Sequence, residues 1–300
     1  MEHEQLSTTP VLSIRTKQPS VAVSYLYTPA PRIDTLIAKR QEIAADVVVV
    51  DLEDSVHVNA KAAAREKVGD FDFSPLTKLG LRLAIRINNI GSFDGLRDLE
   101  MLRERYERGD CAIASVLLPK INHASEVRIF RSLFDSLKQR PRLVSFIETI
   151  EAVENADAIA SVSDAICFGQ ADLNAQMYSP HPVFLDYART RMCAAAARYR
   201  IQSIDTSSFE IQDMAKFERE CVAAKECGFT GKVAIHPVQV DPINRIFGVS
   251  SEVLAGYRRL IDAYENADVG FAMKDGQVVA PPFVAKARMM LATYDKWARE

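Results

Sequence analysis

The 300-residue chain lacks the features that mark a secreted, thiolate-metal or membrane protein. Its five cysteines are scattered and include no CxxC pair or Cys/His cluster, so they are expected to be reduced thiols of the core. The first twenty residues have no apolar segment of a signal peptide, and Glu2 and Glu4 argue against a transit peptide. No apolar run approaches the roughly 18 residues that cross a membrane. We therefore expect a cytoplasmic protein.

The chain also lacks a large excess of charge of either sign. Its 37 Lys and Arg residues face 40 Asp and Glu residues, a formal net charge of −3. This balance gives no electrostatic case for binding nucleic acid or a membrane surface. What is present is an apolar fraction of 48%, enough for an ample core in a globular protein. Small acidic metabolites remain candidate partners, bound by local positive charge.

Short apolar, β-branched runs alternate with longer amphipathic segments, a pattern typical of repeated βα units around a parallel sheet. Strands are expected at residues 21–28, 46–53, 81–88, 115–120, 142–149, 164–169, 201–206 and 232–237. Helices are expected at residues 33–44, 93–107, 124–137, 151–160, 185–198 and 214–227. Eight consecutive units predict an α/β fold of the (β/α)₈ TIM-barrel type.

The chain divides into three predicted parts. Residues 1–20 are expected to be disordered, and residues 21–245 to form the barrel. Residues 246–300 exceed what a barrel needs and contain two helical patterns, at 251–267 and after Pro281-Pro282, separated by an Asp275-Gly276 turn. We expect this tail to be a helical lid or an arm that reaches a neighbouring subunit.

Polar residues collect at the carboxyl ends of the expected strands, where the active sites of barrels lie. Glu148 ends the fifth strand in Phe146-Ile-Glu-Thr149, and Asp172 follows the sixth in Phe168-Gly-Gln-Ala-Asp172. Two carboxylates at adjacent strand ends form a hard-cation site for Mg²⁺ or Mn²⁺, which leaves positions open for a bidentate 2-oxo or 2-hydroxy acid. The alternative is a carboxylate pair satisfied by backbone N–H groups or an arginine.

Seven segments at expected strand ends together resemble the citrate lyase β-subunit-like family of the HpcH/HpaI aldolase superfamily. They are Leu26-Tyr-Thr-Pro29, Asp51-Leu-Glu-Asp-Ser-Val56, Ile85-Arg-Ile-Asn88, Leu118-Pro-Lys120, Ile147-Glu-Thr149, Phe168-Gly-Gln-Ala-Asp-Leu173 and Ile235-His-Pro-Val-Gln239. The resemblance implies a Mg²⁺-dependent carbon–carbon lyase of the malyl-CoA or citramalyl-CoA type, usually a homotrimer or hexamer of barrels. It also implies that Glu148 and Asp172 are the metal ligands.

The resemblance assigns roles to further residues. Arg86 would contact the thioester or carboxylate oxygen, where a fixed guanidinium stabilises an enolate; the alternative is a salt bridge to Glu53 or Asp54. Glu53 and Asp54 would lie beside the metal and orient its waters. Arg32 would help to hold the acyl-CoA or carboxylate end of the ligand, or would be a surface residue at a helix start.

Two other strand-end residues have two interpretations each. Lys120 is either a cation for the substrate or the partner of Glu148 inside the barrel. His236 is either a general base or a residue whose hydrogen bond fixes the loop before Pro237.

Three departures from the family pattern bear on function. Family lyases carry a tail motif resembling Asp-Gly-x-x-Val-Asp-x-Pro, whose second aspartate protonates the enolate from a neighbouring subunit, and Ala280 stands at that place here. The first strand has Val23-Ser24 and Thr28-Pro29-Ala30 where the family has Arg-Ser and Val-Pro-Gly, which argues against a usual CoA site. Residues 51–54 also lack the histidine of the pyruvate aldolases.

Three functions therefore stay open. The favoured one is a Mg²⁺-dependent lyase or aldolase that converts a 3-hydroxy acid skeleton, with or without a CoA thioester, to a 2-oxo acid and an enolate-derived product. The second is a metal-dependent acyl-CoA thioesterase, which needs no enolate donor. The third is a non-catalytic ligand-binding protein or complex subunit.

Overall fold

The computed structural model describes residues 21–179, 181–266, 272–274 and 277–299. The expected disordered segment, residues 1–20, and the expected Asp275-Gly276 turn lie outside the described residues.

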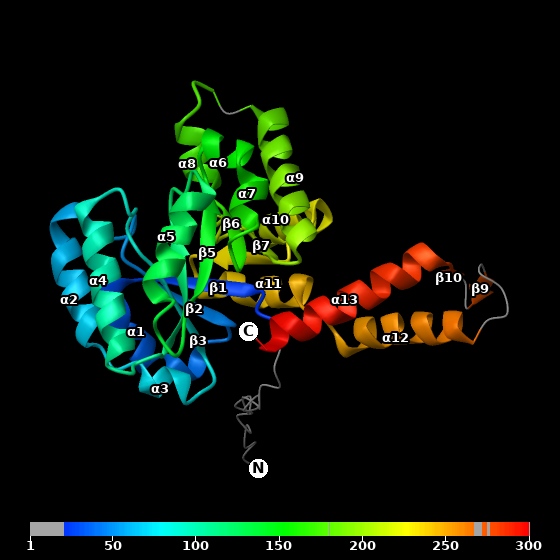
Figure 1. Cartoon of the computed structure of the whole chain (residues 1–300), viewed down its shortest axis with the longest axis horizontal. Coiled ribbons are helices and arrows are strands. Elements are labelled where there is room, and N and C mark those ends of the chain that lie inside the picture. Colours follow the sequence, from blue (N-terminus) through cyan, green and yellow to red (C-terminus); the bar gives the residue numbers. More distant parts are fainter. Residues whose placement is uncertain (1–20, 180, 267–271, 275–276, 300) are drawn as a thin grey trace, which may run out of the picture.

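Eight parallel strands form a closed barrel in which each strand pairs with its neighbours in sequence and β8 pairs with β1 (Figure 1). The predicted (β/α)₈ fold is thereby confirmed. The strands are β1 (Ser24–Pro29), β2 (Val47–Asp51), β3 (Arg82–Arg86), β4 (Ile113–Leu118), β5 (Arg142–Ile147), β6 (Ala165–Phe168), β7 (Gln202–Asp205) and β8 (Gly231–Ala234). Most strands end one to three residues before the predicted positions, so several polar residues stand on the loops just beyond them.

Helices surround the barrel between successive strands (Figure 1). The α-helices are α1 (Ile33–Ala38), α2 (Lys61–Asp70), α3 (Ser74–Thr77), α4 (Phe93–Glu107), α5 (Ala124–Phe134), α6 (Ile150–Glu154), α7 (Ala156–Ala160), α8 (Gln170–Ala175), α9 (Pro182–Tyr199), α10 (Met214–Cys227) and α11 (Val240–Phe247). Short 3₁₀ helices are η1 (Ala30–Arg32), η2 (Arg40–Glu42), η3 (Val58–Ala60) and η4 (Pro237–Gln239).

The helical layer differs from the prediction at several places. The helix expected at residues 33–44 ends at Ala38 and is followed by the separate 3₁₀ helix η2. The helix expected at residues 151–160 is two short helices that meet at Asn155, whose side-chain amide donates to the Asn122 carbonyl at 2.9 Å. The unpredicted helix α2 carries Arg65 on its buried face, where the guanidinium pairs with Asp94 and Asp98 at 2.6 Å each. A buried arginine interrupts the apolar periodicity that would have indicated a helix.

The strands are buried on both faces, and alternate residues supply two cores. In β2, Val47 and Val49 point into the barrel, whereas Val48 and Val50 pack against the helices. Within the barrel, Tyr25, Phe146 and other apolar side chains fill the interior below the carboxyl ends of the strands. The interior of the barrel is therefore a packed core that opens only at the carboxyl ends of the strands, and it is not a channel.

The residues after α11 form an arm that projects from the barrel (Figure 1). It consists of α12 (Ser251–Glu265), the antiparallel strands β9 (Ala272–Lys274) and β10 (Gln277–Val279), and α13 (Pro281–Arg299). The end of α13 returns to the barrel, where the buried Trp297 donates from Nε1 to the Arg200 carbonyl at 3.2 Å. In the described part of the chain, no helix combines the length and apolarity needed to cross a membrane.

Candidate metal and active site

The carboxyl ends of the strands enclose a cavity of about 340 Å³. Its walls combine aromatic side chains with carboxylates and one guanidinium. Residues that line it include Tyr27, Asp51, Asp54, Arg86, Phe146, Glu148, Phe168, Asp172 and Phe209. Glu148 follows β5, and Asp172 lies in the first turn of α8, directly after β6. The fold thus brings both proposed metal ligands to one cavity, as the strand-end positions predicted.

Glu148 is a buried carboxylate with one strong hydrogen bond. Its Oε1 accepts the backbone N–H of Lys120 at 2.6 Å, and only 1% of the residue is exposed. Burial, and then the negative charges of Glu53 and Asp172, raise the pKa of Glu148 to about 8. A carboxyl group in this position favours a bound cation, because a cation removes the cost of its negative charge.

The place of Glu148 depends on Gly169, which follows β6. A Cβ atom on residue 169 would lie 2.3 Å from Glu148 Oε2 and 2.4 Å from Glu148 Cβ, far inside ordinary contact. Only glycine allows the backbone after β6 to approach the side chain after β5 this closely. The glycine in Phe168-Gly-Gln-Ala-Asp172 is therefore part of the site's construction.

Arg86 is held by Asp51, a partner that the sequence analysis did not assign. The two residues are directly paired across β2 and β3, and Arg86 Nε and Nη2 each donate to one Asp51 oxygen at 2.7 Å. Burial alone would raise the pKa of Asp51, but the hydrogen bonds and charge of Arg86 outweigh it, and the pKa is lowered. The guanidinium also lies over the rings of Tyr27, at 5.1 Å, and Phe146, at 5.9 Å.

The expected pairing of Arg86 with the acidic residues after β2 is also present. Arg86 Nη1 lies 2.9 Å from Glu53 Oε2 and 3.8 Å from Asp54 Oδ2. Glu53 is buried, which raises its pKa although Arg86 and Lys120 oppose the shift. Asp54 is exposed and reaches the cavity from its rim.

The predicted pairing of the Lys120 side chain with Glu148 is wrong. The backbone N–H of Lys120 contacts Glu148, whereas its ammonium lies 2.7 Å from Glu53 Oε1 and 3.5 Å from Asp172 Oδ1. Lys120 follows β4 in a left-handed conformation with φ of 53°, which turns the N–H and the side chain toward different carboxylates. The position of Lys120 at a strand end does not predict this backbone conformation.

Carboxylates outnumber cations around Glu148 and Asp172, whereas Asp205 at the end of β7 is matched by Lys232 and Arg189. Five carboxylates, those of Asp51, Glu53, Asp54, Glu148 and Asp172, face two cations, Arg86 and Lys120. Among the described residues, no group of three or more His, Cys, Asp and Glu side chains is arranged to hold a metal. Mg²⁺ fits this donor set, because it binds through one or two carboxylates and completes its shell with water and substrate oxygens.

Three residues singled out in the sequence lie away from the cavity walls. Arg32 is exposed at the end of η1. The exposed His236 accepts the Val238 N–H on Nδ1 at 3.3 Å, which agrees with the role of fixing the loop. Ala280 is buried at the start of α13, on the arm that points away from its own barrel (Figure 1).

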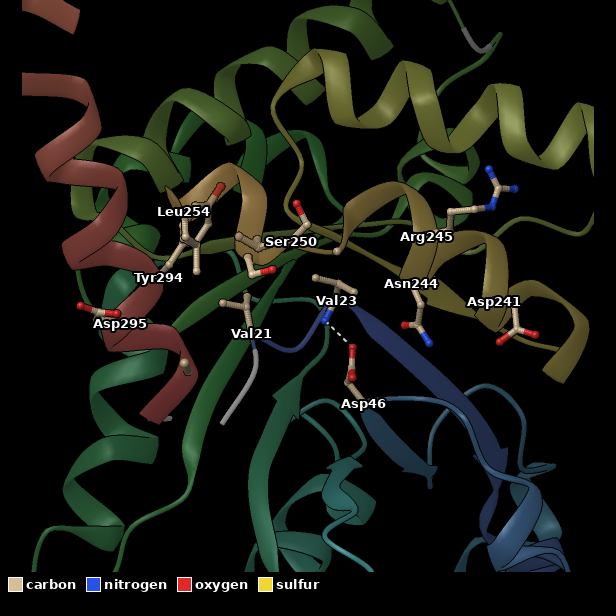
Figure 2. Close-up of a pocket in the computed structure, with 14 residues that line it drawn as sticks. Val21, Val23, Asp46, Asp241, Asn244, Arg245, Ser250, Leu254, Tyr294 and Asp295 are labelled. Carbon is tan, nitrogen blue, oxygen red and sulfur yellow. Dashed lines mark hydrogen bonds between the residues drawn. The ribbon is translucent and has the colours of Figure 1, made fainter. Parts of the chain in front are cut away.

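A second, larger cavity of about 660 Å³ lies at the opposite end of the barrel (Figure 2). It is bounded by the starts of β1 and β2 and by α11, α12 and α13. Asp46, one of its three carboxylates, already accepts the N–H groups of Val23, at 2.9 Å, and Ser24, at 3.3 Å. This end of a barrel usually serves stability, and the contacts of Asp46 fit that role.

Comparison with known proteins agrees with the geometry. A model of the HpcH/HpaI aldolase/citrate lyase family matches residues 24–237, from β1 to the loop after β8. The citrate lyase subunit beta-like protein of Deinococcus radiodurans is 29% identical over 91% of this chain and 98% of its own. A (3S)-malyl-CoA thioesterase of Cereibacter sphaeroides is 27% identical over 90% of this chain and 93% of its own. The mitochondrial citramalyl-CoA lyase of Homo sapiens is 28% identical over 76% of this chain and 72% of its own.

A solved structure gives the same relationship. CitE of Mycobacterium tuberculosis, in complex with magnesium, acetoacetate and coenzyme A, is similar with a TM-score of 0.71. The match has 28% sequence identity and covers 92% of this chain and 99% of that one.

Proposed function

Because this chain belongs to the HpcH/HpaI aldolase/citrate lyase family, we propose that it is a Mg²⁺-dependent carbon–carbon lyase of the citrate lyase β-like type. It cleaves, or in reverse condenses, a 3-hydroxy acyl-CoA or related hydroxy acid to a 2-oxo acid and an enolate-derived acyl product. Support comes from the family itself and from a relative named as a citramalyl-CoA lyase.

The excess of carboxylates around Glu148 and Asp172 is the observation that carries the proposal. Burial makes the charge of Glu148 costly without a cation, and Asp172 lies close enough to raise its pKa further. These two residues would hold Mg²⁺, and Mg²⁺ is present in the related CitE structure. When bound, the ion would supply a Lewis acid for the carboxylate and keto oxygens of a 2-oxo acid.

Arg86 is the residue that would stabilise the negative charge of the enolate. Arginine carries five N–H donors, and the hydrogen bonds to Asp51 use two of them, whereas Glu53 Oε2 makes an ion pair with Arg86 without a hydrogen bond. Arg86 lines the cavity, so a donor that Asp51 does not take would be available to a substrate oxygen. Because Asp51 and the two aromatic rings fix the guanidinium beforehand, little reorganisation is needed when the charge develops.

Glu53 and Asp54 would act beside the metal and not as its ligands. Glu53 is engaged by Arg86 and Lys120, which leaves it suited to orienting water molecules near the ion. Arg32, exposed after β1, would contact the acyl-CoA or carboxylate end of a ligand that extends out of the cavity.

The test is to incubate the purified protein with malyl-CoA and with citramalyl-CoA, in Mg²⁺ and in EDTA, and to follow the products by mass spectrometry. Metal-dependent formation of acetyl-CoA with glyoxylate or pyruvate is the expected result. Glu148→Ala and Asp172→Ala should abolish both turnover and Mg²⁺ binding. Turnover that survives either substitution would overturn the assignment of the site.

A second candidate function is hydrolysis of the acyl-CoA thioester. It is favoured by Ala280, which stands where the family pattern has the proton-donating aspartate, and by the related malyl-CoA thioesterase. Attack by water on the thioester requires no donor to an enolate carbon. In the same assay, free CoA with an intact hydroxy acid and without a 2-oxo acid would identify this activity.

A further inference from the structure

Lys120 has a backbone conformation that glycine would adopt without strain. Its φ is 53°, in the left-handed region that side chains disfavour. Among the residues that the structure describes, the only other non-glycine residue with a positive φ is Arg200, which caps the end of α9. That conformation is common at helix ends, whereas Lys120 follows a strand. Its strain therefore needs a different explanation.

The backbone contacts of Lys120 do not require a lysine. Its N–H donates to Glu148 Oε1 at 2.6 Å, and the Asn89 amide donates to the carbonyls of Pro119 and Lys120 at 3.3 Å each. A glycine would offer the same N–H and carbonyl without the strain. What only lysine brings to this position is its side chain.

The side chain places an ammonium group among three carboxylates at the mouth of the cavity. Lys120 Nζ lies 2.7 Å from Glu53 Oε1, 3.5 Å from Asp172 Oδ1 and 3.7 Å from Asp54 Oδ1. Of these, Glu53 is buried and Asp172 belongs to the proposed metal pair. The ammonium therefore neutralises part of the charge that Mg²⁺ would neutralise.

We propose that Lys120 is a positioning residue that sets the affinity of this site for Mg²⁺ through Asp172 and Glu53. The ammonium stabilises the metal-free arrangement of these carboxylates and opposes the charge of an incoming cation. A contact that stabilises the metal-free state lowers metal affinity by the same factor. The inference rests on the proposed function, because it takes Glu148 and Asp172 as the ligands.

The test measures Mg²⁺ binding by calorimetry at fixed ionic strength, in the absence of substrate. Lys120→Met removes the charge and keeps most of the volume, Lys120→Gly keeps the backbone conformation, and Lys120→Arg keeps the charge. Lys225→Met is the matched control, because Lys225 lies at the end of α10 and its ammonium donates to the Ile246 carbonyl, away from the cavity. Each Met or Gly variant loses one positive charge.

Lys120→Met and Lys120→Gly are expected to lower the Mg²⁺ dissociation constant about tenfold or more, since a unit charge a few ångströms away is removed. Lys120→Arg and Lys225→Met should stay within about threefold of the wild type. The melting temperature of Lys120→Met should fall in EDTA and recover in saturating Mg²⁺. If Met and Gly variants bind Mg²⁺ no more tightly than the wild type, the role of Lys120 is refuted. If the wild type binds no Mg²⁺, the proposed metal site falls with it.

Discussion

Replacing Gly169 by alanine should disable the site without removing any of its chemical groups. The new Cβ would lie 2.3 Å from Glu148 Oε2 and 2.4 Å from Glu148 Cβ. Rotation of the Glu148 side chain relieves the first contact but not the second, because Cβ does not move with χ1. The backbone after β5 or β6 must therefore shift.

The size of the effect follows from these distances. Ordinary carbon contacts lie at about 3.5–4.0 Å, so relief requires a movement of about 1 Å. Overpacking of this kind costs about 1–3 kcal/mol of folding stability. A misplacement of about 1 Å at a reacting site can cost about 100-fold in rate. Gly169→Ala should thus weaken Mg²⁺ binding and lower kcat/KM by about 100-fold, at a modest cost in stability.

The assay combines denaturant unfolding with calorimetric titration of Mg²⁺ and the product assay described above. Gly256→Ala is the control, because Gly256 lies inside α12 and its added Cβ would meet no atom nearer than Arg259 Nη2 at 3.9 Å. That change should raise helix stability by roughly 0.5–1 kcal/mol and leave metal binding unchanged. Wild-type Mg²⁺ affinity in Gly169→Ala would refute the reasoning about how Glu148 is placed.

Three further predictions concern charge. The pKa of Glu148 is about 8 in the folded metal-free protein. Below that pH, Mg²⁺ affinity should fall about tenfold per pH unit, and about one proton should be released per bound ion. Calorimetric titrations at several pH values, in two buffers of different ionisation enthalpy, measure the affinity and the number of protons released. Because that pKa is raised from 4.5 to about 8, metal-free wild-type protein should lose stability as pH rises across this interval, whereas Glu148→Gln should not lose it. The measurement is the change in urea midpoint between pH 5 and pH 9. The same change in both proteins would show that the pKa shift is absent. Arg86→Lys should lower turnover about 100- to 1,000-fold, because an ammonium lacks the fork that pairs with both Asp51 oxygens; steady-state kinetics within tenfold of wild type would contradict this role.

The barrel was predictable because its signal repeats. Each unit has a short apolar strand that the helices bury, as in residues 47–50, and the polar residue that follows it marks the carboxyl end. The helix α10 begins and ends where its periodicity predicts, at Met214 and Cys227. Helix α2 was missed because the buried face of Lys61–Asp70 carries a salt-bridged arginine, which no local pattern distinguishes from an exposed one.

The sequence predicted which strand-end residues meet at one edge of the barrel, but it did not predict how they pair or that Arg32 lies away from the cavity walls. Strand ends identified Glu148, Asp172, Arg86 and Lys120, because parallel strands bring their carboxyl ends to one edge. Besides the expected ion pair with Glu53, Arg86 donates two hydrogen bonds to Asp51. This pairing follows from the register of β2 with β3, which joins residues 35 positions apart. The direction of the Lys120 side chain depends on its positive φ. That backbone conformation could not be predicted, because a positive φ is usually found at glycine and not at lysine.

At the proposed site Mg²⁺ would have two competitors in the metal-free protein, and they would act on different carboxylates. The proton would compete at Glu148, whose pKa is about 8, whereas the Lys120 ammonium would compete at Asp172 and Glu53. If the two act independently, Lys120→Met should shift the whole dependence of Mg²⁺ affinity on pH toward tighter binding and leave its slope unchanged. A changed slope would show that the proton and the Lys120 ammonium do not act independently.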